Sequence, residues 1–452
     1  MTDSAPRSPS VPKPARTDTV AVTGLDLQEG KTIPRGWVVA WAFWDWGGAA
    51  FNAVITTFVF TVYLTSTPAF GNSDEVTIKL GWGTIASGLI IALLAPVTGQ
   101  RSDGTGRRKL WLGIYTAVVV AVSAAMFFVR PESQLLPLGI FLIAAGTVFF
   151  ELASVNYNAM LAQVSTPKTV GRVSGFGWSM GYFGGILLLL VLYFGFIHPA
   201  VGLFGVTDKD GLSVRVSMLL AAGWLAAFAV PVLLKVPELP TVVSESPRAG
   251  FFASYGILFR DVARLWRESR ETVLFLISSA IFRDGLTGVF MYGGVLAAVV
   301  FRFSKSDVIV FAIAANVVAG VSTVLVGRLD DRLGAKLVMV LALGGTIVAG
   351  LAVFFLHSGG VAIFWIFGLL MCVFVGPAQS ASRSFLARVI PAGKEGEVFG
   401  LYATTGKAAS FLAPILFTSF AAIFGATVWG ILGIVIVLLV GLVLLIPVRA
   451  RV

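Results

Sequence analysis

Long apolar runs separated by short polar connections set the main limit on what this chain can fold into. Each run is long enough to cross about 30 Å of hydrocarbon at a rise of about 1.5 Å per residue. Backbone amides in hydrocarbon must find hydrogen-bond partners within their own segment, so the runs are predicted to be helices. The sequence therefore predicts an all-α membrane protein with 12 transmembrane helices, at about 36–64, 79–98, 110–129, 137–163, 173–198, 214–234, 271–301, 307–326, 337–356, 362–388, 398–424 and 428–447.

The composition agrees with lipid as the main solvent. Hydrophobic residues make up 57% of the chain and charged residues 12%, whereas a soluble chain carries about 25% charged residues. One cysteine, Cys372, and two separated histidines, His198 and His357, provide no disulfide framework, no zinc site and no catalytic set. We therefore expect no cofactor, no metal and no enzymatic activity.

The net charge of +10 does not indicate a nucleic-acid partner, because the basic residues lie in the connections between apolar runs. They gather in alternate connections, which is the positive-inside pattern of membrane proteins. We therefore expect both chain termini to be cytoplasmic. The connections predicted to face outward contain only Lys79, Arg130, Lys209, Arg215, Arg302 and Lys305.

The order of the runs predicts four parts. Residues 1–34 are polar and are expected to form a disordered cytoplasmic tail without a signal peptide. A first six-helix bundle is expected over 35–234 and a second over 271–452. The connection at 235–270 has apolar residues at helical spacing between basic ones, which predicts an amphipathic helix on the cytoplasmic surface. The short C-terminal tail favours a bacterial cytoplasmic membrane.

The two halves repeat short motifs in the same order. Gly99, Asp103 and Gly106 follow the second run, and a similar string with Asp331 and Gly334 follows the eighth. Further matches join runs 1 and 7, 4 and 10, and 5 and 11. Repeated bundles of this kind are typical of secondary transporters whose binding site lies near the midplane between the halves.

The paired loop strings resemble the signature of the major facilitator superfamily. Four further stretches resemble its vacuole-effluxer-like branch, which includes a fungal vacuolar amino-acid effluxer and many bacterial members; they begin at Trp44, Gly171, Phe282 and Gln379. The resemblance implies two pseudo-symmetric six-helix bundles and suggests amino-acid efflux. Two positions depart from the bacterial pattern, since Trp44 and Arg283 stand where Tyr and Asn are common.

Charged residues inside the predicted spans are the candidates for the transport site, because a charge in hydrocarbon is costly and usually faces a cavity or a partner. The resemblance implies that helices 1, 4, 7 and 10 line a central cavity. We expect Asp284 or Asp45 to take up and release a proton. The alternative is a structural ion pair, such as Asp284 with Lys407, Asp45 with Arg283, or Glu151 with Arg172. The candidates for substrate binding or proton coupling are Asp45, Asn52, Glu151, Arg283, Asp284, Gln379 and Lys407.

The repeated loop strings are predicted to latch the cytoplasmic side, with Asp103 resting on a helix N-terminus or on an arginine such as Arg107. The alternative is a plain connecting turn. Arg383, Asn156 and Asn158 are also expected to serve a gate or a helix end. The predicted cytoplasmic gate consists of Gly99, Asp103, Gly106, Arg107, Gly327, Asp331, Gly334 and Lys336.

Together these features predict a monomeric secondary transporter that moves a small polar solute by alternating access, coupled to protons. A phosphate-binding loop is absent, since the nearest string, 400–408, has the wrong spacing and lacks the required Ser or Thr. Two alternatives stay open: a receptor or sensor built on a transporter fold, and an exporter of hydrophobic, drug-like compounds.

Overall fold

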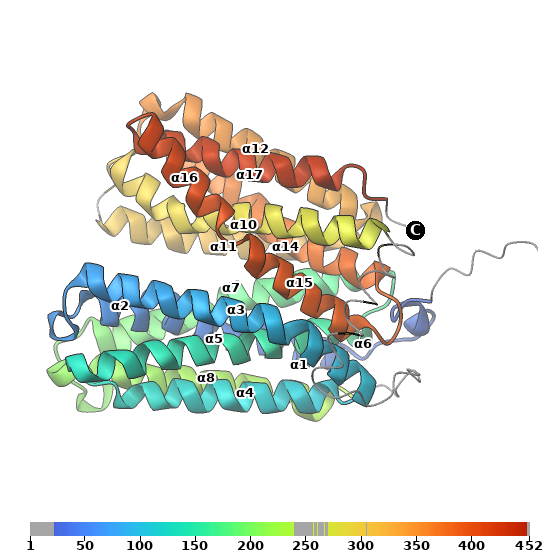
Figure 1. The fold of residues 1–452 in the computed structure, drawn as a ribbon, viewed down its shortest axis with the longest axis horizontal. Helices are drawn as coiled ribbons and strands as arrows, with labels where there is room; N and C mark the ends of the chain where they lie inside the picture. Colours follow the sequence, from blue (N-terminus) through green and yellow to red (C-terminus); the bar gives the residue numbers. More distant parts are fainter. Residues whose placement is uncertain are drawn as a thin grey trace, which may run out of the picture.

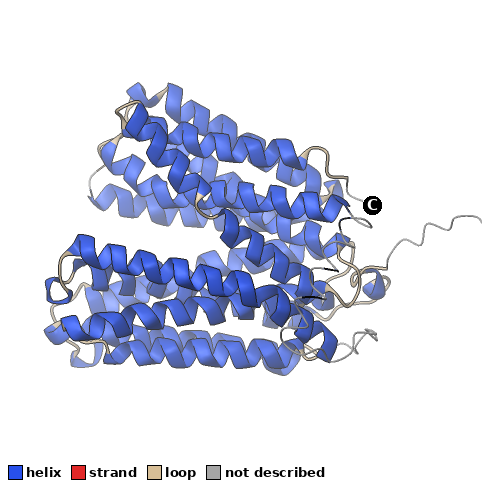
Figure 2. Cartoon of the chain, viewed as in Figure 1, coloured by secondary structure: helices blue, strands red, loops and turns tan. Residues whose placement is uncertain are grey.

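The computed structural model describes residues 22–238, 256, 260, 266, 270–303 and 305–449. Two helical bundles lie side by side, with the N-terminal half below and the C-terminal half above in Figure 1. The described residues form helices and connections without a β-strand, as Figure 2 shows. The all-α prediction is confirmed.

The N-terminal half contains six membrane spans, several of them built from more than one helical segment. Its first span changes from α-helix to π-helix and back. The elements are α1 (Arg35–Ala49), the π-helical η2 (Ala50–Phe58) and α2 (Phe60–Ser66), then α3 (Ser73–Thr105), α4 (Arg108–Ala125), α5 (Leu136–Ala159) with α6 (Leu161–Val164), α7 (Val170–Leu192) with the π-helical η6 (Tyr193–Ile197), and α8 (Leu212–Lys235).

The C-terminal half repeats this plan with six further spans. Its fifth span is interrupted, as described below. The elements are α10 (Arg270–Val299), α11 (Lys305–Leu333), α12 (Ala335–Phe355), α13 (Val361–Ile363) with the π-helical η10 (Phe364–Gly368) and α14 (Leu369–Val389), α15 (Glu395–Ala409) with α16 (Leu412–Ile423), and α17 (Gly430–Leu445).

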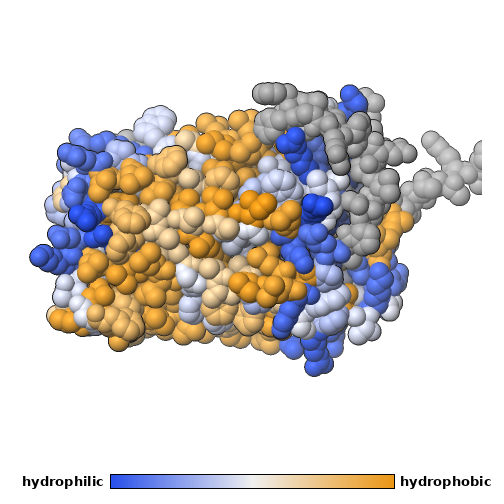
Figure 3. Space-filling model, turned by 90° about the horizontal axis from the view of Figure 1, so that it is seen from below, coloured by the Kyte–Doolittle hydropathy of each residue, from blue (hydrophilic) through white to orange (hydrophobic). Residues whose placement is uncertain are grey.

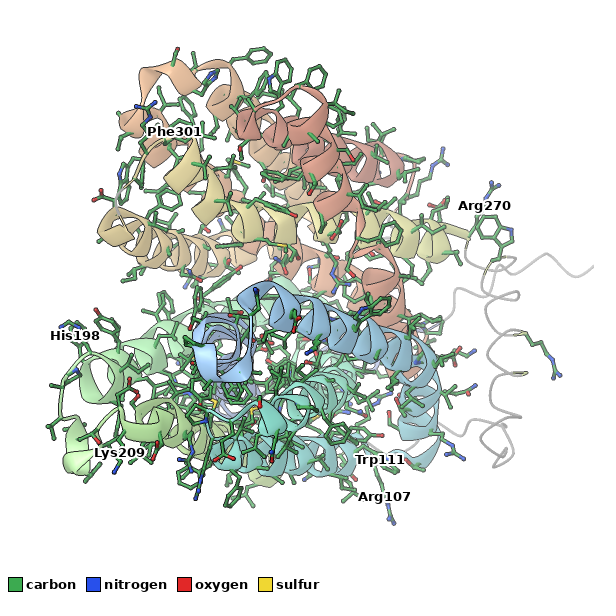
Figure 4. The ribbon with its side chains drawn as sticks, turned by 60° about the vertical axis from the view of Figure 1, so that its left-hand side comes forward. Arg107, Trp111, His198, Lys209, Arg270 and Phe301 are labelled. Atoms are coloured by element: carbon green, nitrogen blue, oxygen red, sulfur yellow. The ribbon has the colours of Figure 1, made fainter. Side chains whose placement is uncertain are left out.

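Among the described residues, twelve helices are long and apolar enough to cross a membrane, which confirms the predicted number of spans. Figure 3 shows an apolar belt between two polar ends on one face of the molecule. Apolar side chains on the outside of the bundle, such as Leu89 and Phe141, are exposed because lipid is their solvent. Figure 4 places Arg107 and Arg270 at one end and His198 at the other. We call the end with Arg107 and Arg270 the basic end.

Two spans are longer than predicted at the basic end. The second was expected to end near residue 98 and the eighth near residue 326, but α3 continues to Thr105 and α11 to Leu333. Gly99, Asp103 and Asp331 therefore lie on helices, and of these motifs only Gly106 and Gly334 adopt the positive φ of a turn. Both helices leave the hydrocarbon here and continue through charged residues, so hydropathy underestimates the length of each helix.

The N-terminal segment differs from the prediction of a disordered tail over 1–34. Residues 1–21 lie outside the described part, but Val22 onward packs against the basic end. The Val22 carbonyl accepts a hydrogen bond from the Ala392 amide at 2.9 Å, and Leu25 is buried. The amphipathic helix predicted within 235–270 lies largely outside the described residues.

A break in the eleventh span separates α15 from α16 at Ser410 and Phe411. Pro414 explains it, because its ring clashes with the carbonyl four residues earlier and it has no N–H to donate. The break frees the Ala413 amide at the start of α16, and this amide donates to Asp284 instead. Pro414 therefore interrupts the helix of the eleventh span.

Contacts between the halves join α3 to α15 and α7 to α11, and further contacts join α7 to α14 and α5 to α15. Glycines permit the closest approach. A Cβ at Gly99 would lie 2.0 Å from the Gly396 carbonyl oxygen, and a Cβ at Gly175 would lie 2.6 Å from the Thr323 carbonyl oxygen. The halves thus meet backbone to backbone in two symmetry-related places.

Candidate functional site

Asp45 lies at the interface between the halves and bonds to both of them. Its Oδ2 accepts a hydrogen bond from the Tyr157 hydroxyl at 2.8 Å, within the N-terminal half. The same oxygen lies 3.3 Å from Nη1 of Arg383 on α14 of the C-terminal half. The predicted alternative partner, Arg283, is therefore wrong, and Arg383 takes its place.

Glu151 and Lys407 form a second pair between the halves. Oε2 of Glu151 on α5 lies 3.8 Å from Nζ of Lys407 on α15, and both side chains are partly exposed, at 22% and 35%. The predicted alternatives, Glu151 with Arg172 and Asp284 with Lys407, are not present. A solvent-exposed pair of this length contributes about 0–1 kcal/mol to stability, so this partly exposed pair is a weak link between the halves.

Arg283 and Asp284 are neighbours on α10 but face different partners. The Arg283 guanidinium stacks 3.8 Å from the ring centroid of Tyr402, and its Nη1 donates to the Tyr402 carbonyl at 3.1 Å. Oδ2 of Asp284 accepts a hydrogen bond from the Ala413 amide at 2.6 Å and so caps the N-terminus of α16. Among the described residues Asp284 has no ion pair, and it is buried.

Asn52 and Gln379 complete the candidates in the spans. Asn52 is exposed on the π-helical segment η2, where its carbonyl accepts hydrogen bonds from the Thr56 and Thr57 hydroxyls at 2.8 Å each. Gln379 is half-buried on α14. Neither of them joins the two cross-half pairs. Within the described residues, no group of three or more His, Cys, Asp and Glu side chains is placed to hold a metal.

Asp103 is the centre of a buried polar cluster at the basic end. Its carboxylate accepts hydrogen bonds from the Gly396 and Glu397 amides at 3.0 and 2.9 Å, so it caps α15 of the other half. Its second partner is Arg108, which also bonds to Glu395 at 2.6 Å. Arg107, the partner suggested by the sequence, is exposed and points away at the basic end (Figure 4).

Asp331 has the same role in the second half. It accepts hydrogen bonds from the Gly171 and Arg172 amides at 2.7 and 3.2 Å, at the start of α7 of the N-terminal half. The neighbouring Asp330 bonds instead to Arg388 at 2.5 Å, within its own half.

The remaining predicted gate residues have separate positions. Gly327 packs on α7, since a Cβ there would lie 3.0 Å from the Gly171 carbonyl oxygen. Gly106 and Gly334 supply the positive φ that their turns require. Lys336 donates to the Ile446 carbonyl at 2.7 Å. Both residues belong to the C-terminal half, so this hydrogen bond does not join the two halves.

Each half therefore caps a helix of the other half with one carboxylate. The α3 carboxylate caps α15 and the α11 carboxylate caps α7. Both contacts close the basic end, and each exists only while the halves are in contact there. Carboxylates at helix N-termini are favoured by the amides and by the helix dipole.

Sequence reasoning missed part of this arrangement. Arg108 and Glu395 were not singled out, because each stands in a charged stretch whose composition is that of a loop. Arg383 was expected to serve a gate or a helix end, but it reaches Asp45. The available signal was that Arg383 is a basic residue within the tenth apolar run. The half that it faces depends on the rotation of α14, which the sequence does not give.

Comparison with known proteins places the chain among transporters. Residues 86–451 match the family described as Vacuole effluxer Atg22 like. The chain is 26% identical over 416 residues to the uncharacterized MFS-type transporter YxiO of Bacillus subtilis, covering 90% of this chain and 93% of that one. It is 24% identical over 306 residues to autophagy-related protein 22 of Yarrowia lipolytica, covering 61% of this chain but 50% of that one. The chain thus spans about half the length of such fungal relatives.

Solved structures show the same fold. The proton:xylose symporter XylE, bound to 6-bromo-6-deoxy-D-glucose, superposes with a TM-score of 0.72 at 14% identity, covering 92% of this chain and 95% of that one. A bacterial homologue of the iron transporter ferroportin, in an outward-facing state, superposes with a TM-score of 0.66 at 16% identity, covering 92% and 99%. At these identities the likeness establishes the fold alone.

Proposed function

The chain belongs to the vacuole effluxer Atg22-like family and has the fold of the major facilitator superfamily, and we propose that it is a proton-coupled transporter of a small polar solute with charges of both signs, such as an amino acid. We further propose that it works as a monomer in a bacterial cytoplasmic membrane, with the basic end facing the cytoplasm. The positive-inside pattern supports this orientation.

One observation carries the proposal for the solute: in the two cross-half pairs inside the spans, Asp45 with Arg383 and Glu151 with Lys407, the charges are divided between the halves by sign. The N-terminal half contributes the carboxylates Asp45 and Glu151, and the C-terminal half contributes the cations Arg383 and Lys407. A zwitterionic solute between the halves would meet carboxylates on one side and cations on the other. The cross-half pairs hold these charges in register while no solute is bound.

Alternating access would break both cross-half pairs in each cycle, and this supports proton coupling. Asp45 has a cation beside it in the present conformation and would lose that cation when the basic end opens. The proton affinity of a carboxylate depends on its nearby charges and its solvation. Asp45 is therefore our candidate for the coupling carboxylate. Asp284, the other sequence candidate, is committed to capping α16 in this conformation.

The test is uptake into proteoliposomes of labelled amino acids, sugars and organic anions, with and without an imposed pH gradient. We expect the gradient to drive uptake of amino acids but not of sugars. Asp45→Asn keeps the size of the side chain and removes its charge, so it should lose the response to the gradient. Transport that ignores the gradient would refute proton coupling, and transport of uncharged sugars alone would refute the proposed solute.

A further inference from the structure

Arg383 reaches from the C-terminal half into an aromatic cage made by the N-terminal half. Its Cζ lies 5.0, 5.7 and 5.6 Å from the ring centroids of Trp41, Tyr157 and Trp178, which we call the aromatic cage. Trp41 and Tyr157 stack on each other at 4.4 Å, so the cage is rigid on this side. Aromatic cages of this kind are a known means of binding organic cations in proteins.

The polar groups around the cage are acceptors suited to a guanidinium. Nη1 of Arg383 donates to Oδ1 of Asn158 at 3.2 Å and lies 3.3 Å from Oδ2 of Asp45. Its Nε donates to the Ser174 hydroxyl at 3.0 Å, and its Nη2 donates to the Ser174 carbonyl at 2.6 Å. Since Arg383 is only 4% exposed, it occupies the site fully.

Gly177 makes room for this arrangement. A Cβ at this position would lie 2.8 Å from the Trp41 ring and 2.9 Å from Nη2 of Arg383. Among the described residues, the groups that hydrogen-bond to the guanidinium or lie against it with their rings, together with this glycine, belong to α1, α5 and α7 of the N-terminal half. The N-terminal half therefore builds a complete cation site, and the other half supplies its occupant.

We propose that this cage is a substrate subsite for the guanidinium group of a transported solute, with Arg383 as an internal ligand that fills it while the basic end is closed. The inference rests on the proposed function, because only separation of the halves at the basic end withdraws Arg383. Withdrawal leaves the Asp45 carboxylate and the three rings without a cation. A guanidinium-bearing solute from the basic side then replaces Arg383 and favours the open conformation.

The geometry favours a guanidinium over an ammonium group. The guanidinium of Arg383 is a planar fork, and acceptors bond to three of its nitrogens, Nε, Nη1 and Nη2. The three aromatic rings lie around it. An ammonium is a compact point charge and cannot reach acceptors spread in this way. L-Arginine and L-citrulline are matched probes, because they share a shape and differ in the charge of the terminal group.

The experiment measures binding of L-arginine and L-citrulline to the purified full-length protein by isothermal titration calorimetry. Arg383→Met keeps an unbranched apolar stem and removes the competing guanidinium from the cage. It should tighten L-arginine binding about tenfold, since the free cage becomes the populated state, and leave L-citrulline unchanged. Adding Asp45→Asn to Arg383→Met should abolish the gain. Ser174→Ala removes one acceptor of Arg383 and provides a milder variant, for which we expect the same preference for L-arginine.

Equal binding of L-arginine and L-citrulline in the Arg383→Met and Ser174→Ala variants would overturn the inference and leave Arg383 as a structural lock. The result is separable from the proposed function because binding needs no transport. Selective binding of L-arginine without any uptake in proteoliposomes would contradict the transport proposal alone. Uptake of other amino acids without selectivity at the cage would contradict this inference alone.

Discussion

Replacing Asp103 by Asn should open the basic end. Asp103 belongs to the N-terminal half, and the amides it caps, Gly396 and Glu397, belong to α15 of the other half. The substitution keeps the size of the side chain but removes its charge. Asn keeps one acceptor oxygen but presents an NH2 group in place of the second, so one of the two cap hydrogen bonds is lost. A hydrogen bond to a charged group contributes about 1.5–3 kcal/mol. Because Arg108 keeps Glu395 as a partner, no unpaired buried charge is added to this cost.

The whole loss falls on the closed conformation, since the open conformation lacks these contacts. A loss of about 1.5–3 kcal/mol lowers the ratio of closed to open molecules by roughly 10- to 150-fold. The assay is a spin-label distance measurement between Thr105→Cys and Arg332→Cys, exposed positions at the basic end of the two halves, in a Cys372→Ser background. The Asp103→Asn variant should show a second population of molecules with a longer distance between the two labels. A label pair at His198 and His357, at the opposite end, should move closer together.

Arg107→Gln is the matched control. Arg107 is exposed beside the cluster, so its replacement should leave both distance distributions as in the unsubstituted protein. Arg108→Gln should shift them in the same direction as Asp103→Asn. The reasoning is refuted if Asp103→Asn leaves the basic-end distance unchanged, or if Arg107→Gln and Arg108→Gln act alike.

Three further outcomes are expected. Gly99→Ala places a Cβ 2.0 Å from the α15 backbone, so it should prevent closure of the basic end and reduce uptake. Gly88→Ala on the same helix places a Cβ with nothing within 4 Å, so it should behave as the unsubstituted protein in the same distance and uptake measurements. Asp284→Asn keeps an acceptor for the α16 amide and should retain gradient-driven uptake, while Asp284→Ala should lower the free energy of unfolding by about 1 kcal/mol in thermal denaturation; loss of the gradient response in the Asn variant would make Asp284 the coupling carboxylate instead. Reversing the charge of Glu151 or of Lys407 should reduce uptake, and reversing both should restore most of it, because the pair joins the halves; a double variant as impaired as the singles would argue against the pair.

The fold was predictable because hydropathy and backbone hydrogen bonding leave few alternatives. Twelve apolar runs in lipid must be helices, and repeated motifs around Asp103 and Asp331 imply two halves. Helix ends at the basic end were predicted poorly. Hydropathy falls where α3 leaves the hydrocarbon, while the helix itself continues to Thr105.

The site was predicted in its residue types but less well in its pairings. Asp45, Glu151 and Lys407 stood out as charges in apolar spans, but their partners depend on helix rotation and on which half each side chain faces. A shift of one residue turns a side chain by about 100° around a helix of 3.6 residues per turn. That uncertainty exchanged Arg107 for Arg108 beside Asp103. Arg283 and Arg383 stand on different helices, α10 and α14, and which of these helices brings its arginine to Asp45 depends on the packing of the two halves.

The segment 22–34 was misjudged for a different reason. Its polar composition predicts disorder, but one apolar side chain, Leu25, is buried at the basic end. Gly24 fits closely beside it, since a Cβ there would lie 2.0 Å from Oε1 of Glu395. Single anchors of this kind leave no periodic pattern for sequence analysis to find.

Movement of the halves against each other is the central claim, and a reversible cross-link tests it most directly. The hydroxyls of Ser174 and Ser380 lie 3.2 Å apart across the interface, so the double variant Ser174→Cys/Ser380→Cys should form a disulfide on oxidation. We would measure amino-acid uptake into proteoliposomes before oxidation, after it, and after reduction, in a Cys372→Ser background. The account predicts that uptake stops when the bridge forms and returns when it is reduced. Uptake that continues with the bridge intact would contradict alternating access at this interface.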